Sequence, residues 1–229
     1  MKAPIVLLTG AYRGIGFEAA RQFVAHGARV IVTSRRRVRG EAAITQLGPR
    51  AVFLELDVTD GASIVAAAAA VGAQFGRLDV LVNNTAVLLD PEGTLLDLSG
   101  EVLRATLETN LIAPLRVTQA MVPLLQRSAA PRVINVASGA GQLSGVPGTW
   151  APAYSISKTA LNMLTRQLSA ALPGIAVNSM CPGWCRTEMG GPDAPRSPEQ
   201  GADTIRWLGL EAPQSTTGGF FRDRLPLEW

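Results

Sequence analysis

The chain contains few of the side chains on which metal sites and disulfide frameworks depend. It has two cysteines and one histidine among 229 residues, and aromatic residues make up 5% of the total. Cys181 and Cys185 alone cannot supply the four ligands that structural zinc usually takes. His26 precedes Gly27 at a predicted helix end, where a surface position is expected. The sequence therefore predicts two reduced thiols and no metal site.

Long apolar runs are also missing. The apolar stretch within MKAPIVLLTG has about five residues, too few for a signal-peptide core, and no run approaches the roughly 18 residues of a spanning helix. The net charge is +3, and the only dense basic run is 35–37, with Arg39 just beyond. One local cluster suits a phosphate contact better than a nucleic-acid duplex. We expect a soluble, cytoplasmic protein without nucleic-acid or membrane partners.

What the sequence does contain is a regular alternation of short apolar runs and longer helical patterns. The runs lie at 5–8, 30–33, 52–56, 80–82, 133–136 and 176–180. This alternation favours a parallel sheet covered on both faces, because each strand needs a crossover to return. No linker or repeat divides the chain. We predict an α/β fold: a Rossmann-type, doubly wound parallel sheet of about seven strands in one domain over residues 1–229.

Helical patterns fill two of the crossovers clearly. The first helix is expected to follow Gly16, to bury Phe17, Ala20 and Phe23, and to stop before Gly27. The alanine tract lies inside 60–75 and strongly favours helix, which predicts the third crossover helix there.

The glycines after the first strand predict a phosphate-binding turn. Gly10, Gly14 and Gly16 permit a tight turn and let backbone N–H groups approach a pyrophosphate at a helix start. The spacing differs from G-x-G-x-x-G, so the position between first strand and first helix carries the argument. The residues assigned to this dinucleotide contact are Gly10, Tyr12, Arg13, Gly14, Ile15 and Gly16.

The end of the second strand indicates which dinucleotide binds. Ser34 stands where an acidic residue would hold the ribose hydroxyls of NAD, and Arg35 and Arg36 follow it. Arginine at this place suits the 2′-phosphate of NADP, and Arg13 could reach the same phosphate. We predict NADP(H) in preference to NAD(H). The alternative is that the arginines form a solvated face.

Two segments rich in proline and glycine follow predicted strands on the carboxyl side of the sheet, where ligands bind in open α/β folds. Residues 139–152 and 184–198 are therefore the predicted substrate-binding loops. We predict that apolar and aromatic side chains of these loops contact the substrate. They are Leu143, Trp150, Trp184 and Met189. Each could instead pack locally.

Several separated motifs together resemble the short-chain dehydrogenase/reductase family over essentially the whole chain. They are T-G-x-x-x-G-x-G at 9–16, Asp57-Val58, Asn83-Asn84, Asn110, Ser138, Tyr154-x-x-x-Lys158 and Pro182-Gly183. The ending CPGWCRTEMGGP looks most like the NADPH-dependent carbonyl reductases.

The resemblance implies a role for each matching residue. Ser138, Tyr154 and Lys158 would be catalytic, with Asn110 completing a proton relay through water. For the cofactor, Asp57 and Val58 would contact adenine, and Asn83 would stabilise the central strand and line the cleft. Tyr154 and Lys158 would also touch the cofactor, and the nicotinamide carboxamide would be held by Thr187 near Cys185, after Pro182 and Gly183.

The residue types also suit the chemistry. A free tyrosine has a pKa of about 10, and Lys158, one helical turn after Tyr154, can lower it with its ammonium group. A helix start after Ala153 would hold the tyrosine at the cleft wall. Ser138 at a strand end can hydrogen-bond the substrate oxygen as charge develops there.

Two features depart from the family pattern. Ala86 stands where the family usually has glycine, which adds a methyl group beside the cofactor. The interval from Ser138 to Tyr154 is 154 − 138 = 16 positions, about three more than is common, and residues 145–152 can absorb the difference as a loop.

The resemblance therefore implies an NADPH-dependent reductase of aldehydes or ketones. The alternatives are a secondary-alcohol dehydrogenase, a 3-oxoacyl thioester reductase, or a non-catalytic NADP-sensing protein. A homodimer or homotetramer through the tyrosine helix is plausible, and the longer loop could disfavour it.

Overall fold

The computed structural model describes residues 3–144 and 148–229. In these residues one eight-stranded sheet has the order β3-β2-β1-β4-β5-β6-β7-β8. The strands are β1 Ile5–Leu8, β2 Arg29–Ser34, β3 Ala51–Glu55, β4 Val80–Asn83, β5 Arg132–Val136, β6 Ala176–Met180, β7 Phe220–Arg222 and β8 Leu225–Pro226. All pairs are parallel except β7 with β8. The predicted Rossmann-type α/β fold is confirmed.

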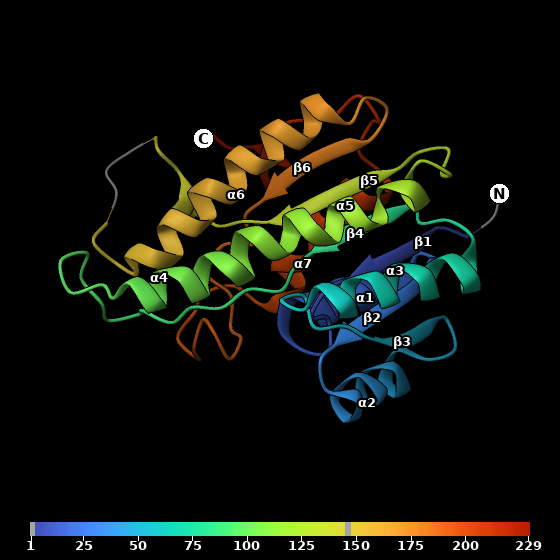
Figure 1. The fold of residues 1–229 in the computed structure, drawn as a ribbon, viewed down its shortest axis with the longest axis horizontal. Helices are drawn as coiled ribbons and strands as arrows, with labels where there is room; N and C mark the ends of the chain where they lie inside the picture. The colour runs from blue at the N-terminus through green and yellow to red at the C-terminus, as the bar shows by residue number, and fades with distance from the viewer. Residues whose placement is uncertain (1–2, 145–147) are drawn as a thin grey trace.

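Helices cover both faces of this sheet (Figure 1). They are α1 Gly14–Ala25, α2 Arg37–Leu47, α3 Gly61–Phe75, α4 Gly100–Leu107, α5 Ala113–Leu125, α6 Pro152–Ala171 and α7 Pro198–Leu210, with a π-helical turn η1 Glu108–Ile112 and a 3-10 turn η2 Gly139–Gly141. Among the described residues, no helix is both long enough and apolar enough to cross a membrane.

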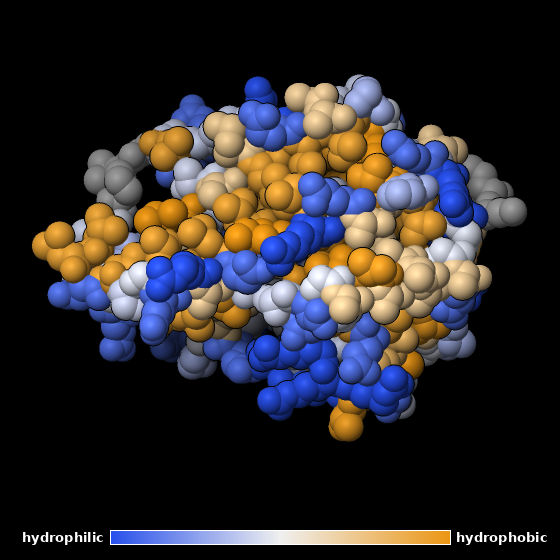
Figure 2. All heavy atoms as spheres, viewed as in Figure 1, coloured by the Kyte–Doolittle hydropathy of each residue, from blue (hydrophilic) through white to orange (hydrophobic). Residues whose placement is uncertain are grey.

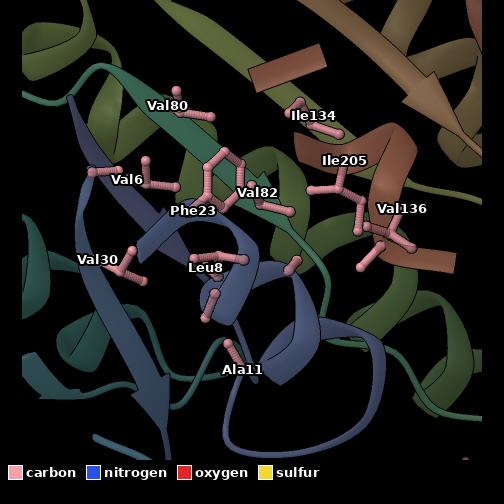
Figure 3. Close-up of a cluster of buried hydrophobic side chains, with 14 of the residues drawn as sticks. Val6, Leu8, Ala11, Phe23, Val30, Val80, Val82, Ile134, Val136 and Ile205 are labelled. Atoms are coloured by element: carbon pink, nitrogen blue, oxygen red, sulfur yellow. The ribbon is translucent and has the colours of Figure 1, made fainter. Parts of the chain in front are cut away.

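Alternate residues of the strands build two separate cores. On one face, Phe23 of α1 and Ile205 of α7 pack on Val6 and Val82 (Figure 3). On the other face, side chains of α3 and α5, such as Ile64 and Met121, pack on the intervening strand residues. The central strands are apolar on both sides because both sides are covered.

All six apolar runs are strands, and the sheet has eight strands where about seven were predicted. The positions of β7 and β8 were not predicted. These two strands have three and two residues, too short for a recognisable pattern of alternation. A two-residue turn joins them, in which Asp223 and Arg224 have φ of 53° and 64°. Positive φ at both central residues is the turn geometry that matches the twist of a hairpin.

Two helices begin earlier in the chain than the sequence predicted. Helix α1 begins at Gly14, so Gly14 to Gly16 form its first turn, and it ends before the exposed His26. Helix α6 begins at Pro152, so Ala153 is already its second residue. Proline at the first helical position needs no hydrogen-bond acceptor for an N–H group, which lets the helix begin there. The third crossover is helical as predicted, with Asp60 accepting a hydrogen bond from Ala62 N at 2.9 Å.

Candidate functional site

A cavity of about 220 Å³ lies at the carboxyl ends of the first strands. It is lined by Gly10, Tyr12, Arg13, Ser34, Arg35, Arg36, Arg39, Leu56, Asp57, Val58, Thr59, Thr85, Ala86, Val87 and Thr109. Eight of these were predicted to bind a dinucleotide from the sequence alone. The glycine turn, the arginine run and the Asp57 segment, which lie far apart in the chain, therefore share one cavity.

The glycine turn packs closely against the segment that follows β4. Gly10 and Gly14 have φ of 62° and 58°, which only glycine adopts without strain. A Cβ at Gly10 would lie 2.7 Å from Thr85 Oγ1. Thr9 Oγ1 accepts hydrogen bonds from the backbone N of Asn84 (2.9 Å) and of Thr85 (3.0 Å). Since Arg13 makes no side-chain cap, the first N–H groups of α1 can serve an anionic ligand.

The side chains of the arginine run 35–37 do not all lie at the cavity. Arg35 and Arg36 line the cavity, whereas Arg37 forms ion pairs with Glu41 and Glu55, each at 3.4 Å. The solvated-face alternative describes Arg37, and contact of the exposed Arg35 and Arg36 with a cofactor stays a prediction. In Figure 2, hydrophilic side chains gather over α2, the helix that begins at Arg37.

Arg39 was not predicted as a site residue, yet it lines the cavity beside Tyr12. Its Nη1 donates to the Tyr12 hydroxyl at 3.1 Å, and its guanidinium lies 5.4 Å from the ring centroid. Arg13 lies 5.2 Å from the same centroid and also pairs with Glu188. Tyr12 therefore holds two cationic side chains at the cavity.

Asp57 is fixed as a hydrogen-bond acceptor on the cavity wall. Its Oδ1 accepts from the hydroxyl of Thr59 at 2.7 Å and from Thr59 N at 3.0 Å. These two hydrogen bonds lower the pKa of the Asp57 carboxyl, and the charge of Arg35 adds to the effect. Asp57 is thus ionised at neutral pH, with its second oxygen available to a donor.

Asn83 lies in the interior rather than on the cavity wall. Its Nδ2 donates to Thr118 Oγ1 at 3.1 Å and to Asn135 Oδ1 at 2.8 Å. The side chain therefore ties β4 to β5 and α5 beneath the site. This agrees with the expected support of the central strand, while contact with a cofactor stays a prediction.

Ser138, Tyr154 and Lys158 come together where β5 meets the first turns of α6. Lys158 Nζ donates to the carbonyl oxygen of Val136 at 2.8 Å and lies 5.4 Å from the centroid of the Tyr154 ring. Ser138 precedes η2, whose Gly141 packs directly on the backbone of α6 at Lys158. The trio is thereby held on two elements that contact each other closely.

The pKa of Tyr154 differs from the expectation. Burial raises it to about 12, and a hydrogen bond with Ser138 acts in the opposite direction. Burial also lowers the pKa of Lys158 to about 8. The predicted lowering of the Tyr154 pKa by Lys158 is therefore not found, because removal from water disfavours the phenolate and the ammonium alike.

Asn110 connects the cavity wall to the catalytic helix. Its Oδ1 accepts from Val87 N (2.8 Å), and its Nδ2 donates to Val87 O (2.9 Å) and Ser157 Oγ (3.0 Å). It lies in the π-helical turn η1, a distortion that is frequent at functional sites. Both hydrogens of Nδ2 are used in these contacts, and a proton relay through Asn110 stays a prediction.

The loop after β6 meets the glycine turn from the other side. A Cβ at Gly14 would lie 3.5 Å from the Thr187 side chain. The predicted residues Ile15, Gly16, Pro182, Gly183 and Cys185 lie outside the cavity lining, as do Gly14 and Thr187. Both cysteines are free and buried, as expected.

The four proposed substrate contacts are all on the surface. Leu143, Trp150, Trp184 and Met189 are 76%, 50%, 57% and 45% exposed. Trp150 alone among them packs on a catalytic side chain, with its ring centroid 5.9 Å from that of Tyr154 in an edge-to-face arrangement. Residues 145–147 of the predicted loop lie outside the described residues.

The described residues combine a glycine turn at the start of α1, a cavity lined by arginines and by Asp57, and a Ser-Tyr-Lys group. Such a combination is suited to a dinucleotide and its reaction. The sequence model of the family described as short chain dehydrogenase matches residues 4–197. The chain belongs to the short-chain dehydrogenase family of oxidoreductases.

Relatives of this short-chain dehydrogenase include reductases and dehydrogenases. (+)-Neomenthol dehydrogenase of Arabidopsis thaliana is 32% identical, with 95% of each chain covered. Carbonyl reductase (NADPH) 1 of Sus scrofa is 31% identical, with 98% of this chain and 94% of the relative covered. The crystal structure of NADPH-bound carbonyl reductase from chicken fatty liver has a TM-score of 0.90 at 29% identity, covering 100% of both chains.

The alignment with the Arabidopsis enzyme spans 281 positions, more than the 229 residues of this short-chain dehydrogenase. Since it covers 95% of each chain, the relative has segments without a counterpart here.

Sequence reasoning missed several lining residues of this short-chain dehydrogenase. Leu56 and Thr59 flank the predicted pair Asp57-Val58, and Thr109 precedes Asn110. These three residues could have been predicted because they are adjacent in sequence to predicted site residues. Thr85 and Val87 follow the Asn83-Asn84 motif in the same way. Arg39 could have been found from helical spacing, because it lies one turn beyond Arg35 and Arg36.

Proposed function

We propose that the protein is an NADPH-dependent reductase that converts aldehydes or ketones to alcohols. The observation that carries this proposal is the meeting of Ser138, Tyr154 and Lys158. These three residues lie outside the lining of the arginine-lined cavity, and Asn110 links helix α6, which carries Tyr154 and Lys158, to the cavity wall at Val87. The carbonyl reductase relatives support the choice of NADPH and of carbonyl substrates.

The cavity and the residues next to it would hold NADPH along its length. The first turn of α1 would bind the pyrophosphate, and Arg35, Arg39 and Arg13 would surround the 2′-phosphate. Asp57, ionised and held by Thr59, would accept a hydrogen bond from the adenine amino group. Thr187, in contact with the glycine turn, would reach the nicotinamide end.

NADPH, when bound, supplies the hydride that reduces the carbonyl carbon. The chain supplies the proton and the alignment. Tyr154 would donate its phenolic proton to the substrate oxygen, and Ser138 would hydrogen-bond the same oxygen as negative charge develops. Lys158 would stabilise the resulting phenolate, since its ammonium lies 5.4 Å from the Tyr154 ring.

The substrate is expected to be an apolar small molecule. Trp150 packs on the edge of the Tyr154 ring and is half exposed, so one wall beside the proton donor is aromatic. An aromatic wall favours ketones with rings or alkyl groups over strongly charged ones.

Oxidation of a secondary alcohol is a second candidate, favoured by the similarity to (+)-neomenthol dehydrogenase. The same residues would then act in reverse, with the Tyr154 phenolate accepting the alcohol proton. Initial rates with NADPH and ketones, compared with NADP and the corresponding alcohols, distinguish the preferred direction.

Replacement of the proton donor tests the proposal. Tyr154→Phe should lower kcat for a reducible ketone by about 100-fold or more, because general acid catalysis typically contributes 10²- to 10⁴-fold. NADPH binding, measured by fluorescence titration, should change by less than about threefold, since the Phe ring keeps the packing. Full activity in Tyr154→Phe contradicts the proposed role, and wild-type NADPH binding without turnover favours a sensing protein.

A further inference from the structure

Helix α6, which carries Tyr154 and Lys158, cannot cap its own beginning. Its first residue, Pro152, has no N–H group, and the residue before it, Ala151, has no side-chain acceptor. Ala151 also adopts a left-handed conformation with φ of 47°, which disfavours residues other than glycine. The first N–H of the helix that needs an acceptor is therefore that of Ala153, directly before Tyr154.

Asp90 supplies that acceptor from a distant part of the chain. Its Oδ2 accepts from Ala153 N at 2.6 Å across a separation of 63 residues. The Asp90 side chain is buried, with 7% of the residue exposed, and its Oδ1 has no hydrogen-bond partner among the described residues. By contrast, the carboxylate cap of α3, Asp60, makes the same contact with the second helical N–H on the surface.

A buried carboxylate with one hydrogen bond is an unfavourable choice for a cap. Loss of hydration opposes its burial, and the positive end of the helix dipole offsets only part of that cost. A surface serine or aspartate caps a helix without this penalty. The hydrogen bond from Ala153 to Asp90 is therefore better explained by the position that it gives helix α6 than by a gain in folding stability.

The contact joins the catalytic helix to the cavity wall. Asp90 follows the segment whose Thr85, Ala86 and Val87 line the cavity. The same segment is held to α6 a second time, because Val87 bonds to Asn110 and Asn110 bonds to Ser157. Two links thus hold the first two turns of α6 against this wall, one on each side of Tyr154.

We infer that Asp90 is a positioning residue, which caps the catalytic helix and holds the Tyr154 backbone at a fixed place relative to the cavity wall. The inference rests on the proposed function, since the position of Tyr154 matters through proton transfer. A small displacement of a proton donor lowers the rate of reaction far more than the binding of a cofactor held elsewhere.

The test compares Asp90→Ala and Asp90→Asn with Asp60→Ala, which removes the corresponding cap of α3. Asp90→Ala should lower kcat about 10-fold or more, with the Kd for NADPH within twofold of wild type. Asp90→Asn should retain at least about a third of kcat, because its amide oxygen can accept the same hydrogen bond. Asp60→Ala should keep kcat within twofold, although its melting temperature falls.

The outcomes separate this inference from the proposed function. Wild-type protein without carbonyl turnover overturns both. With active wild type, an Asp90→Ala kcat within twofold of wild type overturns the inference alone, and so does an Asp90→Asn variant as slow as the alanine variant. If Asp90→Ala does not fold, Asp90→Glu replaces it, because the added methylene displaces the acceptor and should also lower kcat with little change in NADPH binding.

Discussion

Lys158 is a buried cationic side chain. Only 2% of the residue is exposed, and its Nζ donates a hydrogen bond to the Val136 carbonyl oxygen. Burial lowers its pKa from 10.5 to about 8, so the ammonium is held at neutral pH at a cost in folding free energy. Tyr154, its partner, has a pKa raised by burial to about 12. The two groups therefore influence stability in different pH ranges.

The stability of the protein should rise between pH 8 and 10 because of Lys158. Below pH 8 the amine is protonated in both states, and the cost of burying the charge is present in full. Between pH 8 and 10.5 the unfolded chain holds the proton while the folded chain does not, so the free energy of unfolding increases with pH, by about 1 kcal/mol per unit.

Denaturant unfolding of wild type and Lys158→Met at several pH values measures this effect, since other titrating groups cancel in the difference. The range stops near pH 10, because above it Tyr154 lowers stability as the unfolded chain ionises first. Parallel pH curves for the two proteins would show that Lys158 is not neutral in the folded state.

Arg35 should discriminate between the two nicotinamide dinucleotides. Arg35→Ser removes a cationic contact to the 2′-phosphate, and such contacts contribute about 1.5–3 kcal/mol, or about 10- to 100-fold in Kd. The Kd for NADPH should rise by this factor while that for NADH stays within about twofold, measured by fluorescence titration. Arg37→Ser is the matched control, because Arg37 faces Glu41 and Glu55 instead of the cavity. Equal losses in both variants would indicate a general charge effect.

At the scale of elements, the site depends on the contact between η2 and α6. A Cβ at Gly141 would lie 2.6 Å from the backbone C of Lys158 and 2.7 Å from Thr159 N. The 3-10 turn that follows Ser138 therefore packs on the helix with no room for a side chain. This contact fixes how far Ser138 lies from Tyr154 and Lys158, the two other residues proposed to be catalytic.

Gly141→Ala should separate η2 from α6 and so lower kcat about 10-fold or more, with a loss of about 1–3 kcal/mol in stability from overpacking. Gly61→Ala is the control, since nothing lies within 4 Å of a Cβ at this first position of α3. It should keep kcat and gain up to about 1 kcal/mol in stability. Steady-state kinetics with thermal unfolding check both variants, and an active Gly141→Ala would show that α6 tolerates the displacement.

At the scale of the whole molecule, residues at the ends of the first three strands and in the segment after β4 contribute to the cavity lining. A ligand that binds there only when the chain is folded stabilises the entire fold. At a concentration of 100 times its Kd, NADPH should add about 2.7 kcal/mol, which corresponds to a rise of about 5–10 °C in Tm for a domain of this size. NADH at the same concentration should raise Tm less, and equal shifts would contradict the preference for NADPH. A homodimer or homotetramer remains a prediction.

The sequence by itself determined the elements and the local chemistry. Alternating patterns predicted six strands, the glycine turn and Ser138 were assigned from their places at strand ends, and Asp57 from its match to the family motif. Such features depend on neighbouring residues and on the rule that parallel strands end at one edge of a sheet. Patterns of this kind could not predict β7 and β8, which are too short to show a period.

Only the tertiary structure decided which of the candidate side chains meet. It turned Arg37 away from the cavity and Arg39 toward it, and it surrounded Lys158 and Tyr154 with protein. It also placed Asp90 on Ala153, 63 residues away, at the start of the catalytic helix. The physical reason is that orientation and burial arise from packing between distant segments, and burial in turn sets the pKa values on which the chemistry depends.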